Sequence, residues 1–157
     1  MTEARPVTPT LDFCFTIRAD IGEVLSGGAS RNGERLHIAI TGGVVDGPRL
    51  TGRIAPGGSD WPLVRPDGVS RISATYTIIA SDGTPILVRN EGLRASSAEV
   101  LGRLRAGETV QPSEYYFRAT PVFEAPDGVH GWLNETIFVA SILPAGKQIT
   151  VDVYRVS

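Results

Sequence analysis

Apolar and polar residues alternate along most of this chain, with the period of two that is typical of half-buried β-strands. The pattern predicts strands over 11–17, 36–40, 50–54, 61–64, 70–80, 84–91, 114–123, 129–143 and 148–156. Most of these segments are joined by short turn sequences rich in glycine and proline, such as Asp82-Gly83. The longer segment 26–34, SGGASRNGE, is predicted to be a flexible connection.

The segment 96–106 departs from this alternation and predicts the one helix of the chain. Ser96 or Ser97 can cap its N-terminus, Glu99 completes a capping box with Ser96, and Gly107 is a suitable stop. Roughly eight to ten strands with short turns and one short helix predict an all-β fold, and we expect a closed antiparallel β-barrel. A barrel of this size encloses a cavity for one small ligand.

Length and charge narrow the classes of function. The 157 residues fit one domain, expected over 10–157 after a loose N-terminal arm, 1–9. The net charge of −2, with both signs scattered, argues against binding to nucleic acid or anionic lipid. The single cysteine, Cys14, excludes an internal disulfide and a thiolate metal cluster. The chain shows neither a signal peptide nor a membrane-spanning stretch, so we expect a cytoplasmic protein without membrane contact.

Asp60 and Trp61 follow a Gly-Gly bend directly and are the first candidate pair. At the mouth of a barrel, an apolar neighbour raises the pKa of a carboxyl group and makes it a usable general acid or base. Alternatively, Asp60 caps backbone amides and Trp61 closes one end of the core.

Arg89 and Glu91 share one face of the strand 84–91, and Asn90 faces the other way. If the first face is internal, Arg89 anchors a carboxylate or enolate, with Glu91 as its partner or as a base. If that face is external, the two side chains form a surface pair of little energetic value.

Tyr116 and Arg118 share one face of the strand 114–123. Inside the barrel they would bind an anion and donate a phenolic proton, or Arg118 would form a buried structural pair with a carboxylate. Further along, an alternating strand face would form a cavity wall for a planar ligand or an ordinary core face, and it carries Trp132, Asn134 and Phe138. Tyr76 would add a hydroxyl to the same interior or simply pack there.

The chain has no nucleotide-binding or hydrolase signature, and no pattern links its two histidines to carboxylates. We therefore expect neither a metal site nor a cofactor. Four segments are together similar to one known family: GGSDW at 57–61, DG at 82–83 with VRNEG at 88–92, YFRATPVFE at 116–124, and WLN at 132–134. The set resembles the bacterial DUF3237 proteins, also called UPF0311, from about residue 12 to residue 156. The resemblance implies a barrel of calycin-like appearance that is often oligomeric, and it implies no particular activity.

These candidates favour a cofactor-free enzyme of the isomerase, lyase or cyclase type. It would act on a small, planar, partly anionic organic molecule in the barrel cavity, with Asp60, Glu91 and Tyr116 as catalytic groups. The remaining candidates would bind the substrate, and they are Trp61, Tyr76, Arg89, Arg118, Trp132, Asn134 and Phe138. The alternatives are a non-catalytic carrier of lipocalin-like design and a structural subunit. We also expect a homodimer or a higher homo-oligomer.

Overall fold

A computed structural model describes residues 2–157; Met1, the first residue of the predicted arm, lies outside the described residues. These residues form ten strands, one α-helix and two short 3-10 helices. The strands are β1 Leu11–Ser30, β2 Gly33–Asp46, β3 Gly52–Ile54, β4 Gly58–Asp60, β5 Leu63–Val64, β6 Ser70–Ala80, β7 Pro85–Ala95, β8 Tyr116–Glu124, β9 Phe138–Ala145 and β10 Gln148–Val156. The helices are α1 Ala98–Arg105, η1 Pro112–Glu114 and η2 Gly131–Glu135.

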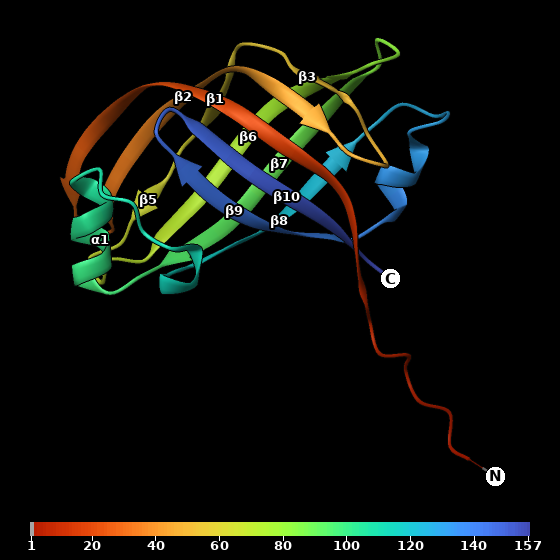
Figure 1. Cartoon of the computed structure of the whole chain (residues 1–157), viewed down its shortest axis with the longest axis horizontal. Helices are drawn as coiled ribbons and strands as arrows, with labels where there is room; N and C mark the ends of the chain where they lie inside the picture. The colour runs from red at the N-terminus through yellow and green to blue at the C-terminus, as the bar shows by residue number, and fades with distance from the viewer. Residues whose placement is uncertain (1) are drawn as a thin grey trace.

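The strands form an antiparallel, barrel-like ring (Figure 1). Its order is β1-β10-β9-β8-β7-β6, followed by the short strands β3, β4 and β5, which join β6 to β2, and β2 pairs again with β1. The seam between β8 and β9 is weak, because only two residue pairs join these strands. The predicted all-β barrel with one helix is confirmed, although its closure is uneven at this seam.

Two segments differ from the sequence prediction. Residues 26–34 belong largely to a long β1–β2 hairpin that turns at Arg31-Asn32, with Ala29 paired to Glu34. The predicted strand 129–143 begins only at Phe138, because the 3-10 helix η2 precedes it. There the Asn134 side chain accepts a bond from the backbone N–H of Ala125 (2.9 Å) and donates one to its C=O (2.8 Å). Such side-chain bonds to the backbone compete with strand pairing.

The first strand also presents a different face from the one that simple alternation indicates. The register of β1 against β10 shifts between Phe13 and Phe15, as at a β-bulge. Cys14 and Phe15 are consequently both buried, while Phe13 is 43% exposed. The buried position of Cys14 agrees with a structural role for its thiol.

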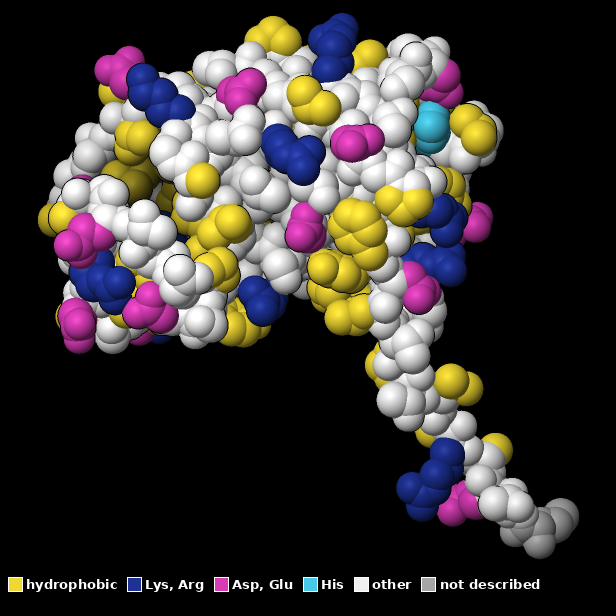
Figure 2. Space-filling view, viewed as in Figure 1, with side chains coloured by type: hydrophobic (Ala, Val, Ile, Leu, Met, Phe, Trp, Pro, Cys, Tyr) yellow, Lys and Arg dark blue, Asp and Glu magenta, His cyan; other side chains and the backbone are white. Residues whose placement is uncertain are grey.

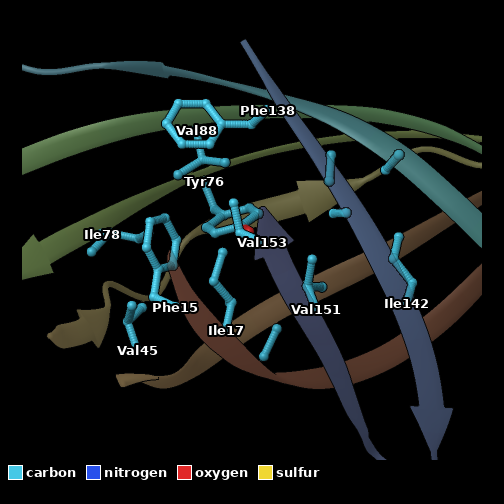
Figure 3. Close-up of a cluster of buried hydrophobic side chains, with 14 of the residues drawn as sticks. Phe15, Ile17, Val45, Tyr76, Ile78, Val88, Phe138, Ile142, Val151 and Val153 are labelled. Atoms are coloured by element: carbon cyan, nitrogen blue, oxygen red, sulfur yellow. The ribbon is translucent and has the colours of Figure 1, made fainter. Parts of the chain in front are cut away.

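Buried side chains from all around the ring fill most of the interior (Figure 3). Phe123 contacts Phe15 and Phe138 edge to face, with ring centroids 5.6 and 5.0 Å apart. This aromatic cluster fills the end of the barrel near η2. At the opposite end lies α1, which begins where the Ser97 side chain accepts the N–H of Val100 (Figure 1). Within residues 2–157, no helix is long and apolar enough to cross a bilayer.

Candidate functional site

A row of three interior positions crosses neighbouring strands in the half of the barrel nearer α1. Asp60 of β4 pairs with Ala74 of β6, and Ala74 pairs with Asn90 of β7. All three side chains are buried. Neighbouring strands are about 4.8 Å apart, so the backbones that carry Asp60 and Asn90 are separated by about 10 Å. Only the methyl group of Ala74 stands between a carboxyl group and an amide.

Asp60 holds its carboxyl group in a desolvated position. It is only 9% exposed, and its Oδ1 accepts the backbone N–H of Ser73 at 3.0 Å. Burial raises the pKa of Asp60 above its usual value, and hydrogen bonds from backbone N–H groups and the charge of Arg94 oppose the increase only in part. A carboxyl group that retains its proton at higher pH is better suited to act as a general acid.

Asn90 has a buried amide oxygen without a partner. The residue is 3% exposed, and no group in the described part of the chain donates a hydrogen bond to Oδ1. Buried polar atoms are nearly always hydrogen-bonded, because an unmade bond costs about 1–3 kcal/mol. This oxygen is therefore available to accept a hydrogen bond from a ligand.

Tyr76 follows Ala74 on the same face of β6 and is 5% exposed. Burial raises the pKa of its hydroxyl group, and the nearby Asp60 raises it further, so the hydroxyl remains a proton-bearing donor. The packing of Tyr76 depends on Gly58 of β4. A Cβ atom at Gly58 would lie 2.4 Å from the Cβ of Tyr76, so any other residue there would displace the ring.

The three polar side chains line a cavity of about 40 Å³. Its other walls are mainly apolar and include Ile38, Ile40, Ile72, Ile142 and Ile149. About 10–15 Å³ is enough for one water molecule, whereas pockets for drug-sized ligands measure about 300–1,000 Å³. The cavity is therefore smaller than the sequence led us to expect, and it admits only a group of a few atoms. Figure 2 shows a hollow lined with hydrophobic side chains at the same end of the molecule, between the β1–β2 hairpin and α1.

Arg94 lies on the interior face of β7, four residues beyond Asn90. Its Nη2 donates to Oγ of the buried Ser70 at 3.4 Å, and its guanidinium lies 5.9 Å from the ring centroid of Phe117. Burial lowers the pKa of Arg94, and the charge of Arg105 lowers it further. Arg94 thus brings a positive charge to the α1 end of the interior.

Four predicted site residues lie on the outside of the barrel, so the internal alternative on which their predicted roles depended is wrong. Arg89 and Glu91 flank the buried Asn90, and both are exposed, as in the external alternative. Tyr116 and Arg118 are likewise exposed, because Tyr115 and Phe117 occupy the interior face. Successive strand residues face opposite sides, so burying Asn90 and Phe117 turns all four outward.

Three of these outward residues meet in a groove on the outer surface of the sheet. The groove measures about 780 Å³ and contains Glu91, Tyr116 and Arg118. Arg71 and Tyr154 also line it. It is separated from the Asp60–Asn90 row by the sheet itself.

The remaining aromatic and amide candidates also lie apart from that row. Trp61 is 51% exposed and lies against the ring of His37 at a tilt of 45°, with ring centroids 4.3 Å apart. Trp132 belongs to η2 rather than to a strand, and it packs between Arg49 (4.3 Å) and Phe138 (5.7 Å). Asn134 bonds the backbone of Ala125 instead of facing a cavity, and Phe138 belongs to the aromatic cluster.

Sequence reasoning missed Asn90 and Arg94 as interior residues. The signal was present in β7, where the buried Ile86 and Val88 define the apolar face. Continuing this face by steps of two reaches Asn90 and then Arg94. A polar side chain on an otherwise apolar face is the more informative observation.

Among residues 2–157, no group of three or more histidine, cysteine, aspartate or glutamate residues could hold a metal ion. The interior polar groups can take part in acid–base and hydrogen-bonding chemistry. Independence from metals and cofactors stays a prediction.

Comparison with known proteins identifies the family. The family model described as "Protein of unknown function (DUF3237)" matches residues 9–156. The chain belongs to the DUF3237 family. A UPF0311 protein of Bradyrhizobium diazoefficiens is 40% identical over 152 residues, which cover 96% of this chain and 99% of the relative. The suspected resemblance to DUF3237 and UPF0311 is therefore confirmed.

Solved structures of related proteins share this fold. A conserved protein of unknown function from Rhodopseudomonas palustris superimposes with a TM-score of 0.90 at 35% identity, covering 97% of this DUF3237 chain and all (100%) of the other. A β-barrel-like protein from Acinetobacter baumannii gives 0.87 at 34% identity, covering 99% and 100%. An enzyme from Penicillium herquei gives 0.74 at 21% identity, covering 99% and 100%, which shows the likeness of the fold alone.

Proposed function

We propose that this DUF3237 protein is a cofactor-independent enzyme that performs acid–base chemistry on a small, planar organic molecule. The reacting group would lie between Asp60 and Asn90 inside the barrel. The proposal rests above all on one observation: the unpartnered, buried oxygen of Asn90 lies in the same row as a buried carboxyl group. Such a pair is costly for folding, and binding a ligand would satisfy it.

Each polar group has a role that suits its surroundings. Asp60, whose pKa is raised by burial, donates a proton from its protonated form to one atom of the substrate. The resulting carboxylate takes a proton from a second atom, which completes an isomerisation or an elimination without a net change in the enzyme. Asn90 accepts a hydrogen bond that fixes the orientation, and the neutral Tyr76 hydroxyl stabilises the oxygen on which charge develops.

A carrier of lipocalin-like design needs a cavity but no protonated carboxyl group. The volume of about 40 Å³ favours the reaction of a small group over storage of a whole ligand. The related fold from Penicillium herquei belongs to a protein described as an enzyme, so a barrel of this shape is compatible with catalysis. These two points favour the enzyme over the carrier and over a purely structural subunit.

The test is a ligand and turnover screen with a matched pair of variants. The wild-type protein would be screened by thermal shift against small carboxylic acids, enones and lactones, and each hit would then be followed for chemical conversion. Asp60→Asn should retain binding and lose turnover by about 100-fold or more. Glu91→Gln removes an exposed carboxyl group one residue from Asn90, and it should leave turnover unchanged.

The outcomes separate the three functions. A hit that wild type converts and Asp60→Asn only binds supports the enzyme. A hit that both proteins bind and neither converts indicates a carrier. Equal loss of turnover in Asp60→Asn and Glu91→Gln would contradict the assignment of the acid to the interior.

A further inference from the structure

We infer that the substrate of the interior site carries a carboxylate, and that the guanidinium of Arg94 binds it. The inference rests on the proposed function and specifies its substrate class. Arg94 takes the role that the sequence suggested for Arg89 and Arg118, which face outward.

Arg94 is partly buried without an acidic partner. The ion pairs among the described residues involve other basic side chains, such as Arg103 with Glu114 and Arg155 with Asp12. Withdrawing a charge from water without a counter-charge is unfavourable, so buried arginines are normally paired. The binding of an anion to Arg94 would offset the free-energy cost of withdrawing its charge from water.

The guanidinium is held in place by neighbours that carry no charge. Ser70, Arg94 and Phe117 pair across β6, β7 and β8, and they form a second row parallel to that of Asp60 and Asn90. The hydroxyl group of Ser70, which is 2% exposed, accepts from Nη2, and Phe117 lies under the guanidinium. These contacts occupy only part of the fork of N–H donors, so other donors remain for a bidentate carboxylate.

The spacing of the two rows suits a compact aromatic or unsaturated acid. Four residues separate Asn90 from Arg94, which corresponds to about 13 Å of strand. The intervening row contains Ile72, Gly92 and Ala119, and the strands approach closely there, because a Cβ atom at Gly92 would lie 2.8 Å from the Cβ of Ala119. We therefore expect only the reacting atoms of a planar molecule to enter the small cavity near Asp60, with its carboxylate at Arg94 toward the hollow at the α1 end (Figure 2).

Charge also favours an anion at this end of the barrel. Arg105 lies close enough to Arg94 to act on it electrostatically, whereas Asp60, the interior acid that acts on it with the opposite sign, forms no ion pair with it. Tyr115, the other titratable neighbour of Arg94, is neutral below its raised pKa. A cationic substrate would meet repulsion at this position.

The test uses benzoate and benzamide, which have the same planar shape and differ in charge. Two NMR resonances report separately on the two ends of the site: the Nε–H of Arg94 and the side-chain amide of Asn90. Benzoate should shift both resonances saturably and bind about 10- to 100-fold more tightly than benzamide. Arg94→Gln should remove this preference. Arg89→Gln, which alters an exposed arginine of the same strand, should leave it unchanged.

Several results would overturn the inference. They are equal affinity for the two probes, no saturable benzoate shift at Arg94, and equal effects of Arg94→Gln and Arg89→Gln. If Arg94→Gln fails to fold, Arg94→Lys replaces it, because lysine keeps the charge but loses the fork of N–H donors. The comparison of the two probes on the wild-type protein also still tests the inference. If benzamide shifts the amide resonance of Asn90 as strongly as benzoate does, and the Arg94 resonance does not shift, binding of a substrate carboxylate by Arg94 is refuted. The proposed interior site would then still stand. If neither probe shifts the amide resonance of Asn90, the result counts against the proposed function as well.

Discussion

The interior of this barrel contains two buried polar side chains, Asp60 and Asn90, among mainly apolar neighbours. Neither residue has an ion-pair partner, and Asn90 has an amide oxygen without any hydrogen bond among the described residues. Residues that lower stability without serving the fold are typical of functional sites. Stability measurements can therefore test the site before a substrate is known.

Replacing Asn90 with leucine should stabilise the protein. The change removes an unsatisfied buried group, so the free energy of unfolding should rise by about 1–2 kcal/mol, measured by urea denaturation. The control is Asn134→Leu, since Asn134 bonds both backbone groups of Ala125. That variant should lose about 1 kcal/mol. A large loss of stability in Asn90→Leu would instead indicate a structural role for the amide.

The stability of the wild type relative to Asp60→Asn should fall as pH rises. The folded-state pKa of Asp60 is raised above the reference value of 3.8. Below that value the folded and unfolded states both hold the proton. As pH rises through the folded-state pKa, the folded protein must bury an ionised group. The melting temperature of Asp60→Asn should therefore exceed that of wild type by a few degrees at pH 7.5, and the difference should vanish near pH 4.

Asp67 provides a control of opposite sign. Its pKa is lowered, chiefly by the side chain of Arg65 and then by the N–H of Val69. Asp67→Asn should therefore reduce stability at neutral pH, and the reduction should diminish as pH falls below the usual range for aspartate. If both variants changed with pH in the same direction, the interior assignment of Asp60 would be wrong.

At the scale of elements, β4 depends on the close approach of Gly58 to Tyr76. Gly58→Ala should lower the free energy of unfolding by about 1–3 kcal/mol, because its Cβ would overlap that of Tyr76. Gly102→Ala in α1 meets open space, and it should raise stability by about 0.5–1 kcal/mol through helix propensity. Thermal and chemical denaturation of both variants would check these values. A neutral Gly58→Ala would mean that β4 can move away from β6.

The elements that could be predicted from the sequence are those whose local signals agree. α1 has its Ser97 cap, and β6 follows its apolar alternation over the predicted range Ser70–Ala80. The hairpin of 26–34 was missed because its strands gain their stability from pairing with each other rather than from an apolar face. The start of β9 was misplaced because the bonds of Asn134 to Ala125 bridge residues nine apart.

The candidate site was predictable only where register could be inferred. Tyr76 follows the clear apolar face of β6, so its interior position was foreseen. Asp60 was paired with Trp61 as a candidate, but the two residues face opposite sides of the sheet. For β8 the two faces carry comparable groups, and only pairing with neighbouring strands decides which face is buried. In β7 the apolar residues Ile86 and Val88 already indicated the interior face, which contains Asn90 and not Arg89 or Glu91.

Across the whole molecule, the two ends of the barrel differ in the side chains that fill them. The end near η2 is filled by Phe15, Phe123 and Phe138, which supply much of the packed core. The end near α1 contains the polar rows and the small cavity. The molecule thus combines a half packed with apolar side chains and a half that contains buried polar groups.

Self-association, like a cytoplasmic location, is a prediction of the sequence and the family resemblance. The expected result of light scattering coupled to size-exclusion chromatography is a mass that is a multiple of 16.7 kDa at micromolar concentration. Exposed apolar side chains on β1 and β8, including Leu11, Phe13 and Tyr116, are available for such contacts. A mass of one chain across the concentration range would refute the oligomer without affecting the interior site.

We propose above all that the ligand binds inside the barrel between Asp60 and Asn90. The most direct measurement is a crystal structure of the Asp60→Asn variant with a compound that the wild type converts. We expect electron density in the interior, with a donor atom of the ligand about 2.7–3.2 Å from Oδ1 of Asn90. Density in the outer groove beside Glu91 and Tyr116, with the interior unchanged, would contradict it.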